Sequence, residues 1–253
     1  MRLHGKTAIV TGAGAGYGAE IARRFVAEGA RVVCADIERE AAERVVDSLA
    51  VAAGSAVAVQ CDVADGASVK AMVAAAVAAM DGYDIIVNNA GITQKPARIA
   101  KITETDIDRL FAVNVKSLYH MAVHGFPVLR RRGGGAVINI ASVTAIRPRP
   151  GMTWYNATKA AVLNLTQSMA AELAPDRIRV NAIAPAAGRT AMFDAMFGEE
   201  DAEAAAARIV ATIPLGRFCA PEDVAAAAVY LASDEAAFVT GVVLPVDGGR
   251  LVG

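Results

Sequence analysis

The chain has 253 residues, 55% of them hydrophobic, and a formal net charge of −1 at pH 7. This length fits one large α/β domain or two small ones, with enough apolar residues for a sizeable core. A near-neutral chain has no basic field to recruit nucleic acid, and the longest wholly apolar run, Ala71 to Met80, is far shorter than the ~18 residues of a membrane span.

A strand, a glycine-rich turn, a helix and a second strand open the chain. The strand from Thr7 to Val10 leads directly into the turn Thr11 to Gly18, TGAGAGYG, and the helical pattern after it ends at Gly29. The second strand runs from Arg31 and ends in Asp36. A βαβ unit of about 30 residues is the context in which a glycine motif indicates a dinucleotide site.

The glycine turn and the acid after the second strand predict which dinucleotide binds. Gly12, Gly16 and Gly18 permit a tight turn and a close approach of backbone to phosphate, beside the free N–H groups of a helix N-terminus. Asp36 can accept hydrogen bonds from ribose hydroxyls, and its charge would repel a 2′-phosphate. We expect Arg39 to face this carboxylate, so the pattern favours NAD over NADP. A glycine loop without a ligand is the alternative.

The alternation of strands and helices continues toward the middle of the chain. Two further strands, Ala56 to Gln60 and Asp84 to Val87, are separated by a helix from Ser68 to Met80. Cys61-Asp62-Val63 follows the first of these strands, and NNAG, Asn88 to Gly91, follows the second.

A long helical pattern from Thr105 to Leu129 carries one polar residue on its apolar stripe. That residue is Asn114. A buried amide without a partner costs roughly 1–3 kcal/mol, so Asn114 should be hydrogen-bonded to backbone groups, to water or to the ammonium group of Lys159. A purely structural amide is the alternative.

A serine, a tyrosine and a lysine form the candidate catalytic group. Ser142 ends the apolar run from Ala136, and Tyr155 and Lys159 lie four residues apart, on one face of the helical pattern that follows. A phenol has a pKa near ~10, which an opposite charge can lower by roughly 1–3 units. We therefore predict that Lys159 lowers the pKa of Tyr155 for acid–base catalysis and that Ser142 donates to the substrate oxygen. An exposed Tyr and Lys on an ordinary helix are the alternative.

The last third of the chain completes the alternation and contains a candidate lid. It has a strand from Ile178 to Ile183, a helix from Pro221 and a last strand from Val242 to Val246. The segment Gly188 to Leu215 has few large side chains, and we expect it to be a mobile lid over a substrate pocket. The whole pattern predicts one α/β domain, residues 1–253, with a doubly wound, Rossmann-like parallel sheet of about seven strands and helices on both faces.

Histidines and cysteines are sparse. His120 and His124 have the spacing of metal ligands, but no third ligand is identifiable, so we expect no metal site. The cysteines are odd in number and widely spaced, which is typical of core residues in a reducing compartment. The N-terminus, MRLHGKTAIV, has no signal-peptide core, so we expect a cytoplasmic protein.

Together these residues resemble the classical short-chain dehydrogenase/reductase family over nearly the whole chain. The family pattern Thr-Gly-x-x-x-Gly-x-Gly is met by Thr11 to Gly18, and Asn-Asn-Ala-Gly is met by Asn88 to Gly91. The helix asparagine and the catalytic serine, tyrosine and lysine of the family match Asn114, Ser142, Tyr155 and Lys159.

The resemblance implies roles for these residues. Asn114 would hold a water that links Lys159 to solvent, Lys159 would also hold the nicotinamide ribose, and Asp62 and Val63 would meet the adenine. Such proteins are usually tetramers built on paired long helices, here Thr105 to Leu129 and Thr153 to Leu173, so a homotetramer is implied. The expected cofactor-binding residues are Gly12, Gly16, Tyr17, Gly18, Asp36, Ile37, Asp62, Val63, Asn89, Ala90, Gly91, Tyr155, Lys159, Pro185, Gly188 and Thr190.

One segment departs from the family pattern. The family commonly has Pro-Gly after the sixth strand and a branched residue shortly before a threonine, whereas this chain has Pro185-Ala186-Ala187-Gly188-Arg189-Thr190. Pro185 and Thr190 match, and Ala186 and Gly188 do not. The departure affects the expected nicotinamide contacts and the floor of the pocket.

Three functions are compatible with these residues. The leading prediction is an NAD(H)-dependent oxidoreductase that interconverts a secondary alcohol and a ketone, with Tyr155 as general acid/base. The second is reduction of 3-oxoacyl groups on a carrier protein or CoA, suggested by Arg147 and Arg149 near the pocket and opposed by Asp36. The third is a dinucleotide-binding regulator without catalysis, which would be expected to lack Tyr155 or Lys159.

Overall fold

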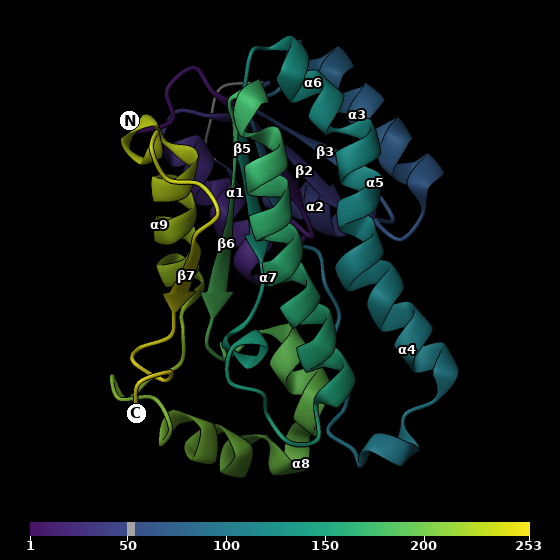
Figure 1. The fold of residues 1–253 in the computed structure, drawn as a ribbon, viewed down its shortest axis with the longest axis vertical. Coiled ribbons are helices and arrows are strands. Elements are labelled where there is room, and N and C mark those ends of the chain that lie inside the picture. The colour runs from purple at the N-terminus through teal and green to yellow at the C-terminus, as the bar shows by residue number, and fades with distance from the viewer. Residues whose placement is uncertain (50–53) are drawn as a thin grey trace.

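Seven apolar strands pair in parallel to form one sheet in the computed structural model, which describes residues 1–49 and 54–253 (Figure 1). Their order is β3-β2-β1-β4-β5-β6-β7, so the direction of winding reverses between β1 and β4. The strands are β1 (Thr7–Thr11), β2 (Arg31–Asp36), β3 (Ala56–Gln60), β4 (Ile85–Asn88), β5 (Gly135–Ile140), β6 (Ile178–Pro185) and β7 (Val243–Val246). The predicted α/β fold with a doubly wound, Rossmann-like parallel sheet is confirmed.

Helices cover both faces of the sheet, because successive residues of a strand point to opposite sides. The core cluster that contains Ala8 and Val10 of β1 includes residues of α1, α2 and α9, and the cluster that contains Ile9 includes residues of α3, α5, α6 and α7. The helices are α1 (Gly16–Ala27), α2 (Arg39–Ser48), α3 (Gly66–Met80), α4 (Glu104–Phe111), α5 (Ser117–His124), α6 (Phe126–Arg131), α7 (Thr153–Leu173), α8 (Ala191–Val210) and α9 (Pro221–Ala232). Of these, α2 was not predicted.

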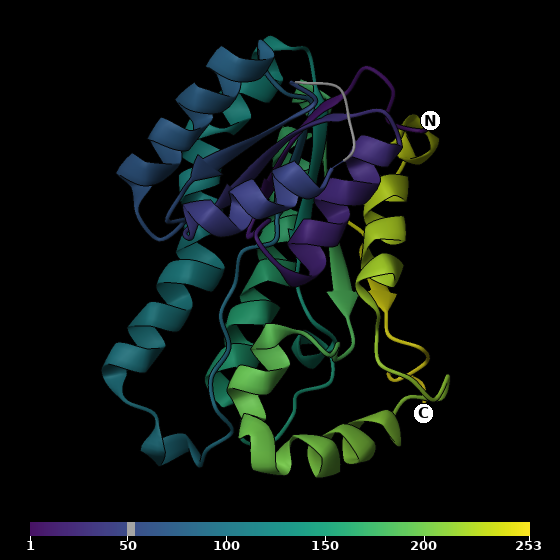
Figure 2. The ribbon, with the colours of Figure 1, turned by 180° about the vertical axis from the view of Figure 1, so that it is seen from behind.

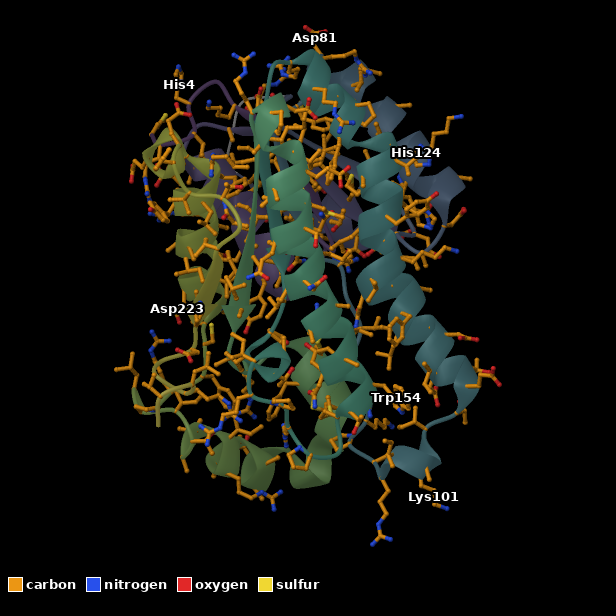
Figure 3. The ribbon with its side chains drawn as sticks, in the orientation of Figure 1. His4, Asp81, Lys101, His124, Trp154 and Asp223 are labelled. Atoms are coloured by element: carbon orange, nitrogen blue, oxygen red, sulfur yellow. The ribbon has the colours of Figure 1, made fainter. Side chains whose placement is uncertain are left out.

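The strands point toward the end of the molecule that α8 crosses, as both ribbon views show (Figures 1 and 2). Asp81, which follows α3 and precedes β4, lies at the opposite end, whereas Trp154, at the start of α7, lies near α8 (Figure 3). In parallel α/β sheets the ligand binds outside the carboxyl ends of the strands, at the point where the winding reverses. The site is therefore expected near α8.

The segment predicted as a long helix from about Thr105 to Leu129 is helical almost throughout, but it is not one continuous α-helix. A π-helical turn, Ala112–Lys116, separates α4 from α5, and α6 begins after Gly125 with Pro127 in its first turn. Proline lacks the N–H that a helix interior needs, which accounts for the second break. The π-helical turn contains Asn114, in keeping with the frequent occurrence of such turns at functional sites.

Two further findings concern metals and membranes. Among the described residues, no group of three or more His, Cys, Asp or Glu side chains is arranged to hold a metal ion. The three cysteines are buried and form no disulfide. No helix within residues 1–49 and 54–253 is long and apolar enough to cross a bilayer.

Candidate active site

Two adjoining pockets lie at the carboxyl ends of the strands. A cleft of about 530 Å³ runs from the glycine turn to Lys159, and a pocket of about 120 Å³ lies between Ser142 and α8. We call them the cofactor cleft and the substrate pocket. Residues that line both are Tyr17, Ala141, Tyr155, Thr190 and Met192. A ligand in the cleft and a second one in the pocket would therefore meet at Tyr155.

The glycine turn leaves room for a ligand at the N-terminus of α1. Gly12 has a φ of +63°, and a Cβ there would lie 2.9 Å from the Cα of Ala90. Gly16, the first residue of α1, has a φ of +55° and lines the cleft. These positions need glycine, and the N–H groups of the helix start can donate hydrogen bonds to a phosphate. The turn fits a dinucleotide.

Asp36 is held rigidly at the edge of the cofactor cleft. Its Oδ2 accepts a hydrogen bond from the N–H of Gly14 at 2.8 Å, and its Oδ1 accepts one from the N–H of Glu38 at 3.1 Å. The expectation that Arg39 faces this carboxylate is wrong, because the Arg39 Nε donates to Glu43 one helical turn away, at 2.8 Å. Arg39 therefore does not neutralise the negative charge that would repel a 2′-phosphate.

Most of the expected cofactor-binding residues line the cleft, and three do not. Gly18 is buried below the turn, where a Cβ would lie 2.1 Å from the Gly12 carbonyl oxygen. Pro185 and Gly188 line the substrate pocket instead. Those that line the cleft are Gly12, Gly16, Tyr17, Asp36, Ile37, Asp62, Val63, Asn89, Ala90, Gly91, Tyr155, Lys159 and Thr190. The contacts themselves stay predictions.

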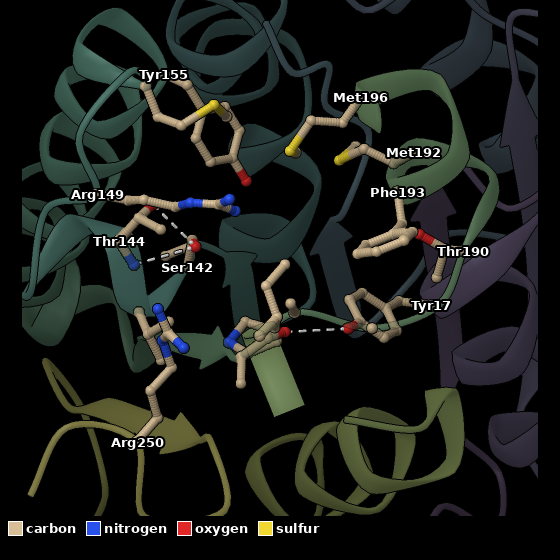
Figure 4. Close-up of a pocket in the computed structure, with 18 residues that line it drawn as sticks. Tyr17, Ser142, Thr144, Arg149, Tyr155, Thr190, Met192, Phe193, Met196 and Arg250 are labelled. Atoms are coloured by element: carbon tan, nitrogen blue, oxygen red, sulfur yellow. Dashed lines mark hydrogen bonds between the residues drawn. The ribbon is translucent and has the colours of Figure 1, made fainter. Parts of the chain in front are cut away.

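Ser142 and Tyr155 face the same pocket (Figure 4). Ser142 follows β5, and its Oγ accepts hydrogen bonds from the Thr144 N–H at 3.2 Å and the Thr144 hydroxyl at 3.0 Å. Tyr155 lies in the first turn of α7, where its N–H donates to Oε1 of Gln94 at 2.9 Å. The Ser142 hydroxyl keeps its own proton available to donate to a substrate oxygen.

Lys159 is buried one turn beyond Tyr155. Its Nζ donates to the Ile140 carbonyl at 2.9 Å and lies 6.0 Å from the centre of the Tyr155 ring. Burial lowers the pKa of Lys159 to about 8. Burial also raises the pKa of Tyr155 to about 12, although the Ser142 side chain lowers it in part. The protein's own groups therefore raise the pKa of Tyr155, contrary to the prediction, because desolvation outweighs the opposing effect of the Ser142 side chain.

The buried charge of Lys159 gives the stability of the fold a pH dependence that Lys159→Met should remove. The unfolded chain holds this proton up to its ordinary pKa of 10.5, whereas the folded protein releases it near a pKa of about 8. Between these values the unfolded state binds more protons, so stability rises with pH. From pH ~8 to ~10.5, the free energy of unfolding of the wild type should increase relative to the variant by about 3 kcal/mol. Urea denaturation of both proteins measures this, and a constant difference would contradict it.

Asn114 is hydrogen-bonded, as predicted, and its partners are the backbone and a threonine. Its Oδ1 accepts from the Ile92 N–H at 2.9 Å, and its Nδ2 donates to the Ile92 carbonyl at 2.9 Å and to Thr158 Oγ1 at 3.0 Å. A Cβ on Gly91 would lie 3.2 Å from Asn114 Oδ1 and 3.3 Å from Lys159 Nζ. Asn114 and Lys159 thus approach the same glycine. The water that Asn114 would hold stays a prediction.

The segment that departs from the family pattern is shaped by Tyr17, whose position in the pocket the sequence did not reveal. The Tyr17 hydroxyl donates to the Ala186 carbonyl at 3.3 Å. A Cβ at Gly188 would lie 2.3 Å from this hydroxyl oxygen and 2.7 Å from the Cys219 carbonyl oxygen. Glycine at 188 therefore makes room for the Tyr17 side chain between the cofactor cleft and the substrate pocket. The signal in the sequence is the missing branched residue at 188.

The expected lid, Gly188 to Leu215, is mostly the helix α8. Phe193 and Ile209 of this helix are buried and line the substrate pocket. The segment thus covers the pocket, and its mobility stays a prediction.

Known proteins resemble this chain over its whole length. The sequence profile described as enoyl-(acyl carrier protein) reductase matches residues 12–250. A 4-formylbenzenesulfonate dehydrogenase of Comamonas testosteroni is 46% identical over 250 residues, which are 99% of each chain. A 3-oxoacyl-[acyl-carrier-protein] reductase of Thermotoga maritima is 37% identical over 252 residues, 100% of each chain. The crystal structure of a 3-ketoacyl-(acyl-carrier-protein) reductase from Brucella melitensis complexed with NADH is 40% identical, with a TM-score of 0.92 over 99% of this chain and 100% of that one.

Proposed function

The chain belongs to the classical short-chain dehydrogenase/reductase family, and from this premise we propose that it is an NAD(H)-dependent oxidoreductase that interconverts a secondary alcohol and a ketone. The observation that carries the proposal is the position of Tyr155, which lines both the cofactor cleft and the substrate pocket beside Ser142. A proton and a hydride must leave or enter the same alcohol group, so the acid–base group has to lie where the two ligands meet.

The side chains would divide the proton chemistry between them. When bound, NAD(H) supplies the acceptor or donor of hydride. In reduction, the neutral Tyr155 phenol donates a proton to the carbonyl oxygen, while the Ser142 hydroxyl donates a hydrogen bond to the same oxygen. In oxidation, the Tyr155 oxygen accepts the proton of the alcohol. Lys159 would hold the cofactor ribose. It would also exchange protons with solvent through a water held by Asn114.

NAD is proposed as the cofactor because of Asp36. The carboxylate lines the cleft and is fixed by two backbone N–H groups. A 2′-phosphate would lie beside this charge, and Arg39 is turned toward Glu43. Like charges held close together in a cleft repel, which disfavours NADP.

An oxidation screen over chemically diverse alcohols, run with NAD and with NADP, tests the proposed function. We expect turnover with NAD and a preference over NADP of at least about tenfold, the factor that each 1.4 kcal/mol of repulsion would give. Asp36→Asn should narrow that preference by weakening the repulsion, although the amide oxygen of Asn can keep only one of the two backbone hydrogen bonds. Tight NADH binding without any dehydrogenation would favour the non-catalytic regulator instead.

The second candidate, a 3-oxoacyl reductase, has one observation in its favour. Arg149 lines the substrate pocket, where it could meet the phosphate of a phosphopantetheine arm. Rates with acetoacetyl-CoA and each cofactor decide this candidate, and no activity with either cofactor would exclude it. A homotetramer and a cytoplasmic location are further proposals that rest on the family resemblance.

A further inference from the structure

The substrate pocket has two arginines on one side and apolar side chains on the other (Figure 4). Arg149 and Arg250 lie on the same side of the pocket as Ser142. Met192, Phe193 and Met196 of α8 form the other side. The Tyr155 hydroxyl points into the space between them. A ligand in this space would meet cations, apolar atoms and the proposed acid–base group at once.

Neighbouring side chains hold the backbone segments that carry Arg149 and Arg250. Arg250 follows β7 and Arg149 follows β5, so they come from distant parts of the sequence. The Arg147 Nη1 joins the two segments by donating to the Arg250 carbonyl at 3.1 Å and to the Gly253 carbonyl at 2.6 Å. The Asn156 Nδ2 donates to the Arg149 carbonyl at 2.9 Å and so fixes that residue to α7. The backbone of both arginines is therefore held in place at this side of the pocket.

Positive charge accumulates at this side of the pocket. Burial lowers the pKa of Arg149, and the neighbouring cations Arg250 and Arg208 lower it further. Burial and the charge of Arg147 also lower the pKa of Arg250, and Asp247 opposes this effect. The Asp247 carboxylate already accepts hydrogen bonds from the N–H groups of Gly249 and Leu251, at 3.0 and 2.9 Å.

The Arg250 side chain keeps donors for a ligand. It donates one hydrogen bond to the hydroxyl of Thr212. A guanidinium group has five N–H donors in a planar fork and binds carboxylate or sulfonate oxygens in pairs. An anion in the pocket would therefore find a charged partner in Arg250.

We propose that the substrate carries a carboxylate or sulfonate group that binds Arg250 and Arg149, while its alcohol or carbonyl carbon lies at Tyr155 and its apolar middle packs against α8. This inference rests on the proposed function and names its substrate class. The size of the pocket, about 120 Å³, fits a middle part of about one aromatic ring, since an apolar cavity of about 150 Å³ binds benzene.

Matched pairs of substrates test the proposal. One pair is para-(1-hydroxyethyl)benzoate and its uncharged amide, and the other is para-(1-hydroxyethyl)benzenesulfonate and its uncharged sulfonamide. We expect kcat/KM with NAD to be at least about tenfold higher for the anion of each pair, the lower end of what a charged hydrogen bond contributes. Equal values within each pair would overturn the anion site and leave the proposed function standing. No turnover of any of the four, nor of other alcohols, would overturn the proposed function as well.

Variants of Arg250 separate anion binding from folding. Arg250→Gln should lower kcat/KM for the two anions about tenfold and change the two neutral analogues little, because it removes the charge and the paired donors. Arg250→Lys should keep part of the preference. Arg131→Gln, an exposed arginine at the far end of α6, is the matched control and should change neither. If Arg250→Gln lowered kcat/KM equally for the anions and the neutral analogues, the proposal would be overturned. It would also be overturned if, in a parallel assay, the variant lowered kcat/KM for acetoacetyl-CoA alone.

Discussion

Tyr155→Phe is expected to lower kcat by about a hundredfold to ten-thousandfold, the usual contribution of a positioned general acid or base. The phenylalanine keeps the ring that lines both pockets and removes the hydroxyl that we propose to exchange a proton with the substrate oxygen. NADH affinity should therefore change little. Steady-state kinetics on the best alcohol of the screen, with NADH titrated by fluorescence, measures both quantities.

Tyr119→Phe is the control for this substitution. Tyr119 lies on α5 with 60% of its surface exposed, so the same chemical change there should leave kcat unaltered. Wild-type rates in Tyr155→Phe would show that the proposed mechanism is wrong. Loss of NADH binding together with kcat would instead make Tyr155 a binding residue, and the proton donor would have to be sought elsewhere.

The sequence predicts the sheet well because its signals are local. Strand Ala56–Gln60 has the predicted bounds, since a short run that follows Gly54-Ser55 and ends before Asp62 has the length of a strand and is too short for a typical helix. The breaks in the predicted helix from Thr105 to Leu129 were not foreseen, because the apolar stripe continues across the π-helical turn at Asn114. The hydrophobic periodicity of a helical sequence shows which face is buried. It does not show whether the backbone hydrogen bonds are those of an α-helix or of a π-helix.

The arrangement and electrostatics of the candidate site were predicted in part. Ser142 and Tyr155 lie together as the motif indicates, but the pKa of Tyr155 is raised. Spacing along a helix gives proximity to Lys159, whereas the pKa depends on how completely both groups are removed from water, which only the packed structure shows. The contact between Tyr17 and Gly188 was also missed, because it joins residues far apart in sequence and no local pattern encodes it.

Gly188→Ala is expected to lower the free energy of unfolding by about 1–3 kcal/mol, the usual cost of adding an atom to a closely packed site, and to lower turnover as well. The new Cβ would lie 2.3 Å from the Tyr17 hydroxyl oxygen and 2.7 Å from the Cys219 carbonyl oxygen, so Tyr17 or the backbone has to move. Either movement displaces a residue that lines the substrate pocket, and Tyr17 lines the cofactor cleft too. Urea denaturation and steady-state kinetics measure the two effects.

A second substitution shows which contact requires the glycine. Tyr17→Phe removes the nearest atom, and the next atom of that ring, Cζ, lies 3.0 Å from the added Cβ. The double variant should therefore lose less stability than the two single losses combined, with a coupling of about 0.5–3 kcal/mol. Additive losses would mean that the Cys219 carbonyl alone requires glycine at position 188.

Gly18→Ala is the contrasting substitution, because its Cβ would lie 2.1 Å from the carbonyl oxygen of Gly12. Tyr17→Phe should therefore not reduce the stability lost in Gly18→Ala. Rescue confined to position 188 would establish that the Tyr17 hydroxyl contributes to the requirement for glycine there.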